Sequence, residues 1–429
     1  MGEYFSVPEF GRIERAALGP RLERLLHRFD ERHAKTSGEW VFDWQHRDYI
    51  KAKNWVGVVD MPGLSIEIYP KIYGDDGHPD ERRRAHGNLL FMLHHAGRLK
   101  VRRREMASLK TKRAPLLEVL IAAFADELLF ELGRGLTRSY VAKEENSRFL
   151  RGKLVLSEQI KHNAAHQERV FVRYDDFTAD QLLNQVLKAA AFRLATRTRI
   201  PATQRVLRQC LGHFADVANH QIRLEDFDKI HLDRNTQRFK RLIDFARLVF
   251  SRESAGASRG EYNTFSLLFP METVFEQFIG TIIRRHPDRI GLQGQRVYLQ
   301  AATQTRWLLR DASGDGSSRL KPDVLVREPG EGTTLILDTK WKHLKPDEQL
   351  RNNGVLPGDL YQLYAYSQRY QCSTNVLLYP KVPGVTPKDF TVDGDAAKCV
   401  RIALIDLSRD LWTERAEFLS DVSRIVSAA

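Results

Sequence analysis

Two short apolar runs joined by a polar turn constrain this chain more than any other stretch. The first run, Val324–Val326, directly follows Asp323, and the second, Leu335–Leu337, leads into Asp338 and Lys340. Apolar runs of this length around a Pro-Gly turn predict a β-hairpin. Because side chains two apart on a strand point the same way, Asp338 and Lys340 should share a face. Strand pairing can then bring Asp323 beside them.

Two carboxylates and one amine at the end of a strand suit the metal-dependent hydrolysis of a phosphodiester. Carboxylate oxygens are the ligands that Mg²⁺ prefers, and the bound metal activates water and neutralises charge in the transition state. A neighbouring lysine can orient the attacking water and stabilise developing negative charge. We therefore predict that Asp323 and Asp338 bind Mg²⁺ (or Mn²⁺) and that Lys340 assists the water.

The alternative for the Asp-x-Lys triplet is an ion pair at the end of a sheet, since exposed hairpins often carry such a triplet by chance. Here the triplet follows a buried apolar run. Burying both charges is costly unless they are paired or bound to a metal. The position of the triplet therefore favours the functional interpretation.

Charge, cysteine usage and hydropathy narrow the class of protein. The formal net charge of +12 favours a polyanionic partner such as nucleic acid, or else an acidic protein surface. Cys210, Cys372 and Cys399 are too few and too scattered for a disulfide framework or a zinc site, so we expect a reducing cytoplasm. No signal peptide is recognisable, and acidic residues interrupt the longest apolar stretch, Leu116–Phe130, so no membrane span is predicted.

A chain of 429 residues predicts two or three domains. Residues 1–114 are predicted to form a β-rich domain, with a strand at Trp40–Trp44 and a hairpin of Val56–Val59 with Leu64–Tyr69 around a Pro-Gly turn. On Leu64–Tyr69, apolar and polar residues alternate, which predicts one buried face. A helix is predicted at Asn88–Ala96, followed by the basic run 98–104, which is either a solvated strand face or a docking surface.

Residues 115–255 are predicted to be mostly helical. Their periodicity predicts helices from Pro115 onward, at Asp180–Arg197 and at Asn235–Phe250. A short strand, Val170–Tyr174, is predicted before the helix at Asp180–Arg197. His162 and His166 have the spacing of metal ligands, but no third ligand accompanies them, so no metal site is expected there. The small polar segment Ser251–Asn263 is predicted to be a linker or loop.

Residues 256–429 are predicted to form a mixed α/β core. The predicted order is a helix (Met271–Ile283), the hairpin (324–337), a second helix around Asp359, and two strands (Val376–Pro380 and Val400–Leu407). Nothing in the chain has the Gly-Lys-Ser/Thr ending of a phosphate-binding loop. The chain is therefore not expected to hydrolyse a nucleoside triphosphate by itself.

The pattern of Pro322-Asp323 followed by Asp338-x-Lys340 resembles the PD-(D/E)xK nuclease superfamily. This resemblance implies a restriction-endonuclease-like core, with a glutamate on the preceding helix completing the metal site. Glu276 matches that position better than Glu272. The resemblance also implies a supporting glutamine on the following helix, for which Gln362 is the candidate.

Further stretches resemble one family: McrC, the nuclease subunit of the McrBC 5-methylcytosine restriction system. The resemblance runs from about residue 50 to about 380 and is carried by Leu64–Ile72, Arg151–Leu154, Val172–Asn184, Met271–Phe278, Lys321–Asp323, Leu337–Lys342 and Tyr361–Tyr366. It implies that the N-terminal domain docks on a hexameric McrB-like AAA+ GTPase and stimulates it, so that GTP acts only through the partner. The C-terminal domain would cut double-stranded, modified DNA, with two nuclease domains pairing in the active complex.

The fold class expected is therefore a multidomain mixed α/β (α+β) chain, with the nuclease core at its C-terminal end. Its expected function is that of the endonuclease subunit of a GTP-driven, modification-dependent (type IV) restriction complex. Two other functions stay open. One is an adaptor that activates an AAA+ partner while its own nuclease fold is silent. The other is a stand-alone DNA repair nuclease whose basic stretch grips DNA directly.

Overall fold

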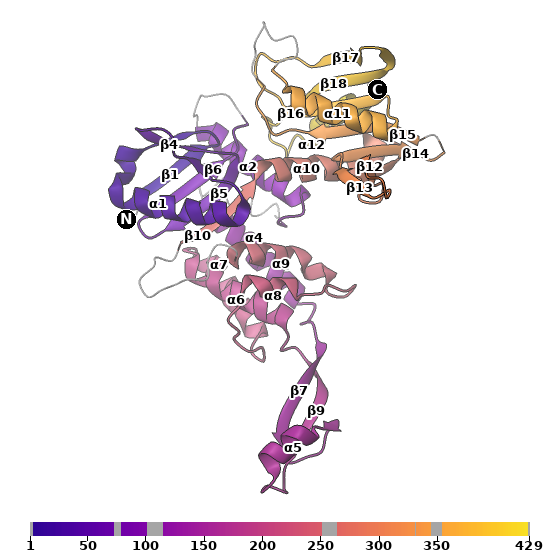
Figure 1. Ribbon diagram of the computed structural model, residues 1–429. Helices are drawn as coiled ribbons and strands as arrows, with labels where there is room; N and C mark the ends of the chain where they lie inside the picture. Colours follow the sequence, from indigo (N-terminus) through magenta and orange to yellow (C-terminus); the bar gives the residue numbers. More distant parts are fainter. Residues whose placement is uncertain are drawn as a thin grey trace. The chain divides into compact units, whose positions relative to one another are not determined.

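The computed structural model describes residues 3–72, 79–100, 115–250, 264–330, 332–344 and 354–427 (Figure 1). Contacts divide the chain into two compact units, Met1–Leu117 with Tyr262–Ala429, and Glu118–Glu261. The two ends of the sequence thus share one unit, and the middle region forms the other. The domain limits expected from the sequence stay predictions. Most of the basic run 98–104, and the expected linker Ser251–Asn263, lie outside the described residues.

The first sheet of the large unit contains the hairpin expected near the N-terminus. Its strand order is β1-β6-β5-β10, with bounds Glu3–Pro8, Leu64–Tyr69, Trp55–Met61 and Phe265–Pro270. β5 and β6 are antiparallel, and Gly63 turns between them at φ 85°, a conformation that glycine adopts without strain. β10 lies far along the sequence but pairs antiparallel with β5. A long-range strand therefore completes a sheet that was expected from residues 1–114 alone.

A long helix and a small sheet enclose the core beside the first sheet. The helix α1 spans Arg15–Ser37, and the small sheet β2-β4-β3 comprises Arg12–Glu14, Tyr49–Ala52 and Phe42–Asp43. The strand predicted at Trp40–Trp44 is therefore limited to two residues. Buried Asp30 of α1 accepts hydrogen bonds from the backbone N–H groups of Val41 and Phe42, at 2.7 and 2.9 Å. These bonds turn the chain toward α1 and shorten the strand.

The prediction of a single buried face on β6 is wrong at Glu67. Its side chain is 1% exposed, because the helix α2 (Pro79–His95) packs against β6. Glu67 accepts a hydrogen bond from Tyr4 Oη at 2.7 Å and pairs with His86 Nε2 at 2.6 Å. α2 also begins nine residues before the predicted start at Asn88, since its first turns are too basic to show an apolar periodicity.

The second sheet of the large unit is mixed, with strand order β11-β14-β15-β16-β18-β17. The bounds are Arg296–Leu299, Val324–Glu328, Gly332–Thr339, Thr374–Pro380, Asp395–Ile405 and Lys388–Val392. β14 and β15 form the expected antiparallel hairpin, whereas β15, β16 and β18 run parallel. Helix α11 (Pro357–Tyr370) connects β15 to β16, as a parallel crossover requires.

The helices of this region cover the second sheet. α11 contributes Leu363 and Tyr366 to a core that includes Leu325, Ile336 and Leu377. α10 (Met271–Arg285) packs on β15, and α12 (Arg415–Ser427) packs on β18. A separate hairpin is formed by β12 (Arg306–Arg310) and β13 (Gly316–Leu320). A short 3-10 helix, η2, spans Pro287–Arg289. Among the described residues, no helix is both long and apolar enough to cross a membrane.

The second unit combines helices with a sheet that the sequence did not predict in full. Its helices are α4 (Leu116–Leu132), α5 (Leu156–Asn163), α6 (Leu182–Arg197), α7 (Pro201–His213), α8 (Leu224–Asp228), the 3-10 helix η1 (Gln237–Phe239) and α9 (Lys240–Phe250). Strands β7, β9 and β8 comprise Ser139–Ser147, Val170–Thr178 and Lys153–Leu154. This arm extends from the helices of the unit (Figure 1). β7 is rich in charged residues and mostly exposed, so its sequence shows no strand periodicity.

The arm also separates the two histidines that have metal-ligand spacing. His162 lies on α5 and contacts Glu158 at 3.1 Å. His166 lies beyond the end of α5 and contacts Glu168 at 3.3 Å. The helix ends at Asn163, so the spacing of four residues does not place both imidazoles on one helical face.

Asn88 connects α2 to the loop after β18 through three hydrogen bonds of its side chain. Its side-chain amide donates to the carbonyls of Leu407 and Arg409, at 2.8 and 2.7 Å, and its oxygen accepts from the N–H of Leu411 at 3.1 Å. Asn88→Ala should lower the free energy of unfolding of the large unit by about 2–4 kcal/mol, because buried backbone groups lose partners. Chemical denaturation followed by tryptophan fluorescence measures this, since all six tryptophans lie in that unit.

Gln293→Ala provides the control for Asn88, because Gln293 is exposed and makes one hydrogen bond, to the carbonyl of Asp288. This variant should unfold within about 0.5 kcal/mol of the wild type. Equal stability of both variants would contradict the role given to Asn88.

Candidate functional site

The β14–β15 hairpin brings two acidic side chains to one end of the sheet. Val324 pairs with Leu337, so the same register puts Asp323 opposite Asp338. Asp338 is 3% exposed, and Asp323 is half-buried. Asp323 Oδ2 accepts two hydrogen bonds from Thr339, from its N–H and its hydroxyl, both at 2.7 Å. These bonds fix the orientation of the Asp323 carboxylate toward its neighbour.

Lys340 lies on the same face as Asp338, as strand alternation predicts. Its Nζ is 2.7 Å from Asp338 Oδ2 and donates a hydrogen bond to Gln362 Oε1 at 2.8 Å. Gln362 in turn donates from Nε2 to Tyr366 Oη at 2.7 Å. Gln362, on α11, therefore holds the lysine amine in place beside the aspartate, and Tyr366 orients Gln362.

Glu276 approaches the aspartates from α10. It accepts a hydrogen bond from Gln300 Nε2, and it lines a cavity of about 410 Å³ together with Asp323, Arg319 and Lys321. Glu272, one turn earlier on the same helix, is exposed and does not line this cavity. The structure thus brings Glu276, not Glu272, to the same cavity as Asp323.

Burial and like charge raise the pKa values of all three carboxyl groups. The pKa of Asp323 rises to about 8 because of burial and then the charges of Asp338 and Glu276. Burial also raises the pKa of Asp338, although Lys340 opposes this shift. The pKa of Glu276 is raised by burial, partly offset by the hydrogen bond from Gln300. The pKa of Lys340 is raised despite its burial, because Asp338 stabilises the charged amine. Raised carboxyl pKa values favour the protonated, neutral forms, so the group resists carrying all three negative charges at once without a further cation.

The two aspartates fit a divalent cation by their chemistry. Both offer carboxylate oxygen, and the buried Asp338 Oδ2 has the amine of Lys340 2.7 Å away. Among the described residues, however, no group of three or more His, Cys, Asp and Glu side chains is close enough to hold a metal ion. The residues therefore fit an Mg²⁺ ion that takes Asp323 and Asp338 and keeps several waters, with Glu276, which lines the same cavity as Asp323, as the candidate for a further ligand.

Asp359 belongs to the site but was not predicted from the sequence. It is 8% exposed, in the first turn of α11. Its carboxylate accepts from Lys342 Nζ, 3.0 Å from each oxygen, and from Tyr379 Oη at 3.2 Å, and it lies 3.9 Å from Lys340 Nζ. The signal that points to it is Lys342, which follows Lys340 at strand spacing. An aspartate in a first helical turn otherwise looks like a response to the helix dipole.

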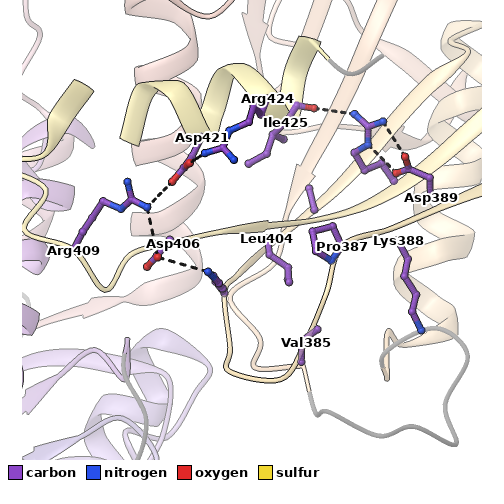
Figure 2. A pocket seen from close by; sticks show the side chains of 13 residues that line it. Val385, Pro387, Lys388, Asp389, Leu404, Asp406, Arg409, Asp421, Arg424 and Ile425 are labelled. Carbon is purple, nitrogen blue, oxygen red and sulfur yellow. Dashed lines mark hydrogen bonds and ion pairs between the residues drawn. The ribbon is translucent and has the colours of Figure 1, made fainter. Parts of the chain in front are cut away.

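A second cavity, of about 520 Å³, lies between α12 and the strands β17 and β18, beside the loops that follow β16 and β18 (Figure 2). Five basic and three acidic side chains line it, so positive charge is in excess: Lys381, Lys388, Arg401, Arg409, Arg424, Asp389, Asp406 and Asp421. Arg409 bridges Asp406 and Asp421, at 3.6 and 2.9 Å. Because β15, β16 and β18 are parallel, their carboxyl ends lie at the same end of the sheet as Asp338.

Comparisons with known proteins agree on a family and a fold. Residues 50–380 match the family described as McrBC 5-methylcytosine restriction system component. A chain of the half-complex from the tetradecameric assembly of Thermococcus gammatolerans McrB AAA+ hexamers with bound McrC is similar, with a TM-score of 0.66 and 21% identity. That match covers 99% of this chain and 100% of the other.

A second solved structure, the McrBC complex of the same organism, gives a TM-score of 0.50 at 23% identity. That match covers 66% of this chain and 88% of the other. At these identities, both likenesses show the fold. No curated protein matches the sequence.

The raised pKa of Asp323 makes the stability of the metal-free protein depend on pH. The unfolded chain releases this proton near 3.8, whereas the folded chain retains it up to about 8. Stability is therefore full at low pH and falls as pH rises through this window. Asp323→Asn removes the titrating group. At pH 8.5, the free energy of unfolding of this variant should exceed that of the wild type by about 2–4 kcal/mol. Denaturation followed by tryptophan fluorescence between pH 5 and pH 8.5, in chelator, tests this; parallel curves for the two proteins would contradict it.

Proposed function

The chain belongs to the McrBC 5-methylcytosine restriction system component family, and on that premise we propose that it is the Mg²⁺-dependent DNA endonuclease subunit of such a complex. The observation that carries this proposal is the convergence of Asp323, Asp338 and Lys340 at the end of the β14–β15 hairpin. A mixed sheet whose hairpin ends in these groups supports a PD-(D/E)xK core. The alternative of a plain ion pair accounts for the contact between Asp338 and Lys340, but not for the second carboxylate held opposite.

In this proposal, Asp323 and Asp338 hold the metal ion, and Glu276 is a further candidate ligand. When bound, Mg²⁺ lowers the pKa of coordinated water and neutralises negative charge that develops on the phosphate. Lys340 keeps its proton, since Asp338 stabilises the charged amine. It can therefore orient the attacking water or donate to a phosphate oxygen. Gln362 limits the positions that the amine can take.

The charge of the protein supports DNA as the substrate. The net charge is +12, and Lys381, which lines the positive cavity, follows β16 at the end of the sheet that carries Asp338. The arginines and lysines of this cavity suit the phosphates of a duplex on either side of the cleaved bond. We propose double-stranded, modified DNA as the substrate, cut in the cytoplasm by two nuclease domains that pair.

The partner in this proposal is a hexameric McrB-like AAA+ GTPase, because the similar solved assembly contains McrB AAA+ hexamers with bound McrC. GTP would act only through that partner. The N-terminal domain remains the proposed docking region. The arm of the second unit adds a further surface, because it exposes the apolar side chains of Phe149, Leu150 and Ile160, each at least 70% accessible. Exposed apolar groups of this kind mark contact surfaces.

Plasmid cleavage separates this proposal from its two rivals. The assay uses the full chain with Mg²⁺, with and without the AAA+ partner and GTP. Cleavage that requires the partner and GTP supports the proposed complex. Cleavage by the chain alone would favour a stand-alone repair nuclease. Faster GTP hydrolysis without cleavage in any mixture would favour the silent adaptor.

Asp338→Ala should reduce DNA cleavage about 100-fold or more, because the metal site loses a ligand and Lys340 loses its partner. Stimulation of the partner's GTPase should be unchanged, since docking does not use this residue. The matched control is Asp395→Ala, at the opposite end of the parallel strands, which should cut like the wild type. Loss of both activities in Asp338→Ala would contradict the division of labour between docking and cutting.

Lys381→Ala tests whether the positive cavity contacts DNA. Lys381 is only loosely paired, 3.8 Å from Asp406, and its side chain is 56% exposed. Removing one phosphate contact should weaken DNA binding and lower the slope of log affinity against log salt by about 1. Lys398→Ala, in the amino-terminal half of β18, is the control. An unchanged slope in Lys381→Ala would remove this cavity from the proposed DNA path.

A further inference from the structure

A glutamate near the start of the chain contacts the candidate nuclease site. Glu9 follows β1, is 0% exposed, and continues the pairing with β6 through a hydrogen bond from its N–H to the carbonyl of Tyr69 at 2.8 Å. Both of its carboxylate oxygens lie 3.1 Å from Trp341 Nε1, which donates to them. Its Oε2 also accepts from the N–H of Lys71 at 3.2 Å. Trp341 is the residue directly after Lys340.

Trp341 contacts both elements that carry the candidate catalytic groups. It continues β15 beyond Lys340, and it is 3% exposed. Its ring packs against Phe275 of α10, with ring centroids 5.2 Å apart. Phe275 directly precedes Glu276. A change in the position of the indole would therefore move Lys340 and Glu276 relative to each other.

The helix that carries Glu276 has its own attachment to the first sheet. β10 pairs with β5 up to Pro270, opposite Trp55, and α10 begins at the next residue. The N–H of Met271 donates to the carbonyl of Asn54 at 3.0 Å. The first sheet thus holds α10 through β10 and holds the end of β15 through Glu9. Both attachments meet at the contact between Trp341 and Phe275.

Burying the carboxyl group of Glu9 is costly, and burial raises its pKa to about 8. An apolar side chain would fill the same space without that cost. What the carboxyl group adds is direction, because it accepts from the indole on one side and from the backbone of Lys71 on the other. Outer hydrogen bonds of this kind orient the groups that hold a metal.

We propose that Glu9 is a positioning residue of the nuclease site. It fixes Trp341 and, through Trp341, the placement of Lys340 on β15 and of Glu276 on α10. The first sheet is then a structural part of the nuclease site rather than a separate docking module. This inference rests on the function proposed above, because it takes the site to be a metal-dependent nuclease.

Two substitutions test the proposal in the full chain. Glu9→Gln keeps the size of the side chain but replaces one acceptor oxygen by an NH₂ group, so one of the two donors loses its partner. Trp341→Phe keeps a ring against Phe275 but removes the Nε1–H donor. Glu417→Gln is the matched control, because it makes the same substitution at an exposed position of α12, whereas Glu272 acts electrostatically on Glu9.

Three measurements are made on each variant. The first is the rate of DNA cleavage with the AAA+ partner and GTP over a titration of Mg²⁺. The second is stimulation of the partner's GTPase. The third is the affinity of the full chain alone for Mn²⁺, measured by calorimetry, which does not depend on cleavage.

Glu9→Gln and Trp341→Phe should each raise the Mg²⁺ concentration for half-maximal cleavage about 10-fold and weaken Mn²⁺ binding by a similar factor. The double variant should be no worse than either single variant, because both remove the same interaction. GTPase stimulation should equal that of the wild type, and Glu417→Gln should match the wild type in all three measurements.

Each contrary result has its own meaning. Wild-type Mg²⁺ dependence and Mn²⁺ affinity in Glu9→Gln would overturn the inference and leave the proposed nuclease intact. Loss of GTPase stimulation together with cleavage in both variants would show a general folding role and also overturn the inference. A wild-type protein that neither cuts DNA nor binds Mn²⁺ would overturn the proposed function itself, and with it the inference.

Discussion

The main physical constraint on this structure is the burial of like charges at the end of one hairpin. Asp323 and Asp338 lie opposite each other, and burial, together with the charges of Asp338 and Glu276, raises the pKa of Asp323 to about 8. One amine, that of Lys340, contacts Asp338. Such an arrangement is unfavourable unless further positive charge is present. Buried carboxyl groups whose pKa values are raised by burial and by neighbouring charges are common at functional sites.

The surroundings hold these charges in place through contacts from several elements. Thr339 orients Asp323, Gln362 holds Lys340, and Asp359 binds Lys342 and Tyr379. These residues come from β15, α11 and β16, which meet where the parallel strands end. Parallel strands with a helical crossover bring their carboxyl ends together, and sites in α/β sheets form there for that reason. A cavity between α12 and β18 adds, in the same sheet region, a surface with more basic than acidic side chains.

The first sheet and the hairpin belong to one compact unit, although their residues come from opposite ends of the chain. β10 joins the first sheet and continues directly into α10, and Glu9 reaches Trp341 across 332 residues. This connection has a consequence for regulation. If a partner docks on the N-terminal region, as the family resemblance implies, a change there has a short covalent and hydrogen-bonded route to the catalytic groups.

The sequence alone determined the local features. Two apolar runs around a turn predicted the β14–β15 hairpin, and alternation along a strand predicted that Asp338 and Lys340 share a face. The buried stripe of α10 was also predicted, because apolar spacing along a helix depends only on neighbouring residues. Gln362 and Glu276 were placed through family resemblance, and the structure brings each to the aspartates or their lysine.

Only the tertiary structure decided which distant residues meet. The position of β10 in the first sheet, the burial of Glu67 beneath α2, and the contact between Glu9 and Trp341 depend on packing between segments far apart in the sequence. Periodicity reports which face of an element is apolar, but it does not report what covers the opposite face. A charged side chain therefore looks exposed in the sequence whenever its partner comes from another part of the chain. Asp359 and Glu9 were missed for that reason.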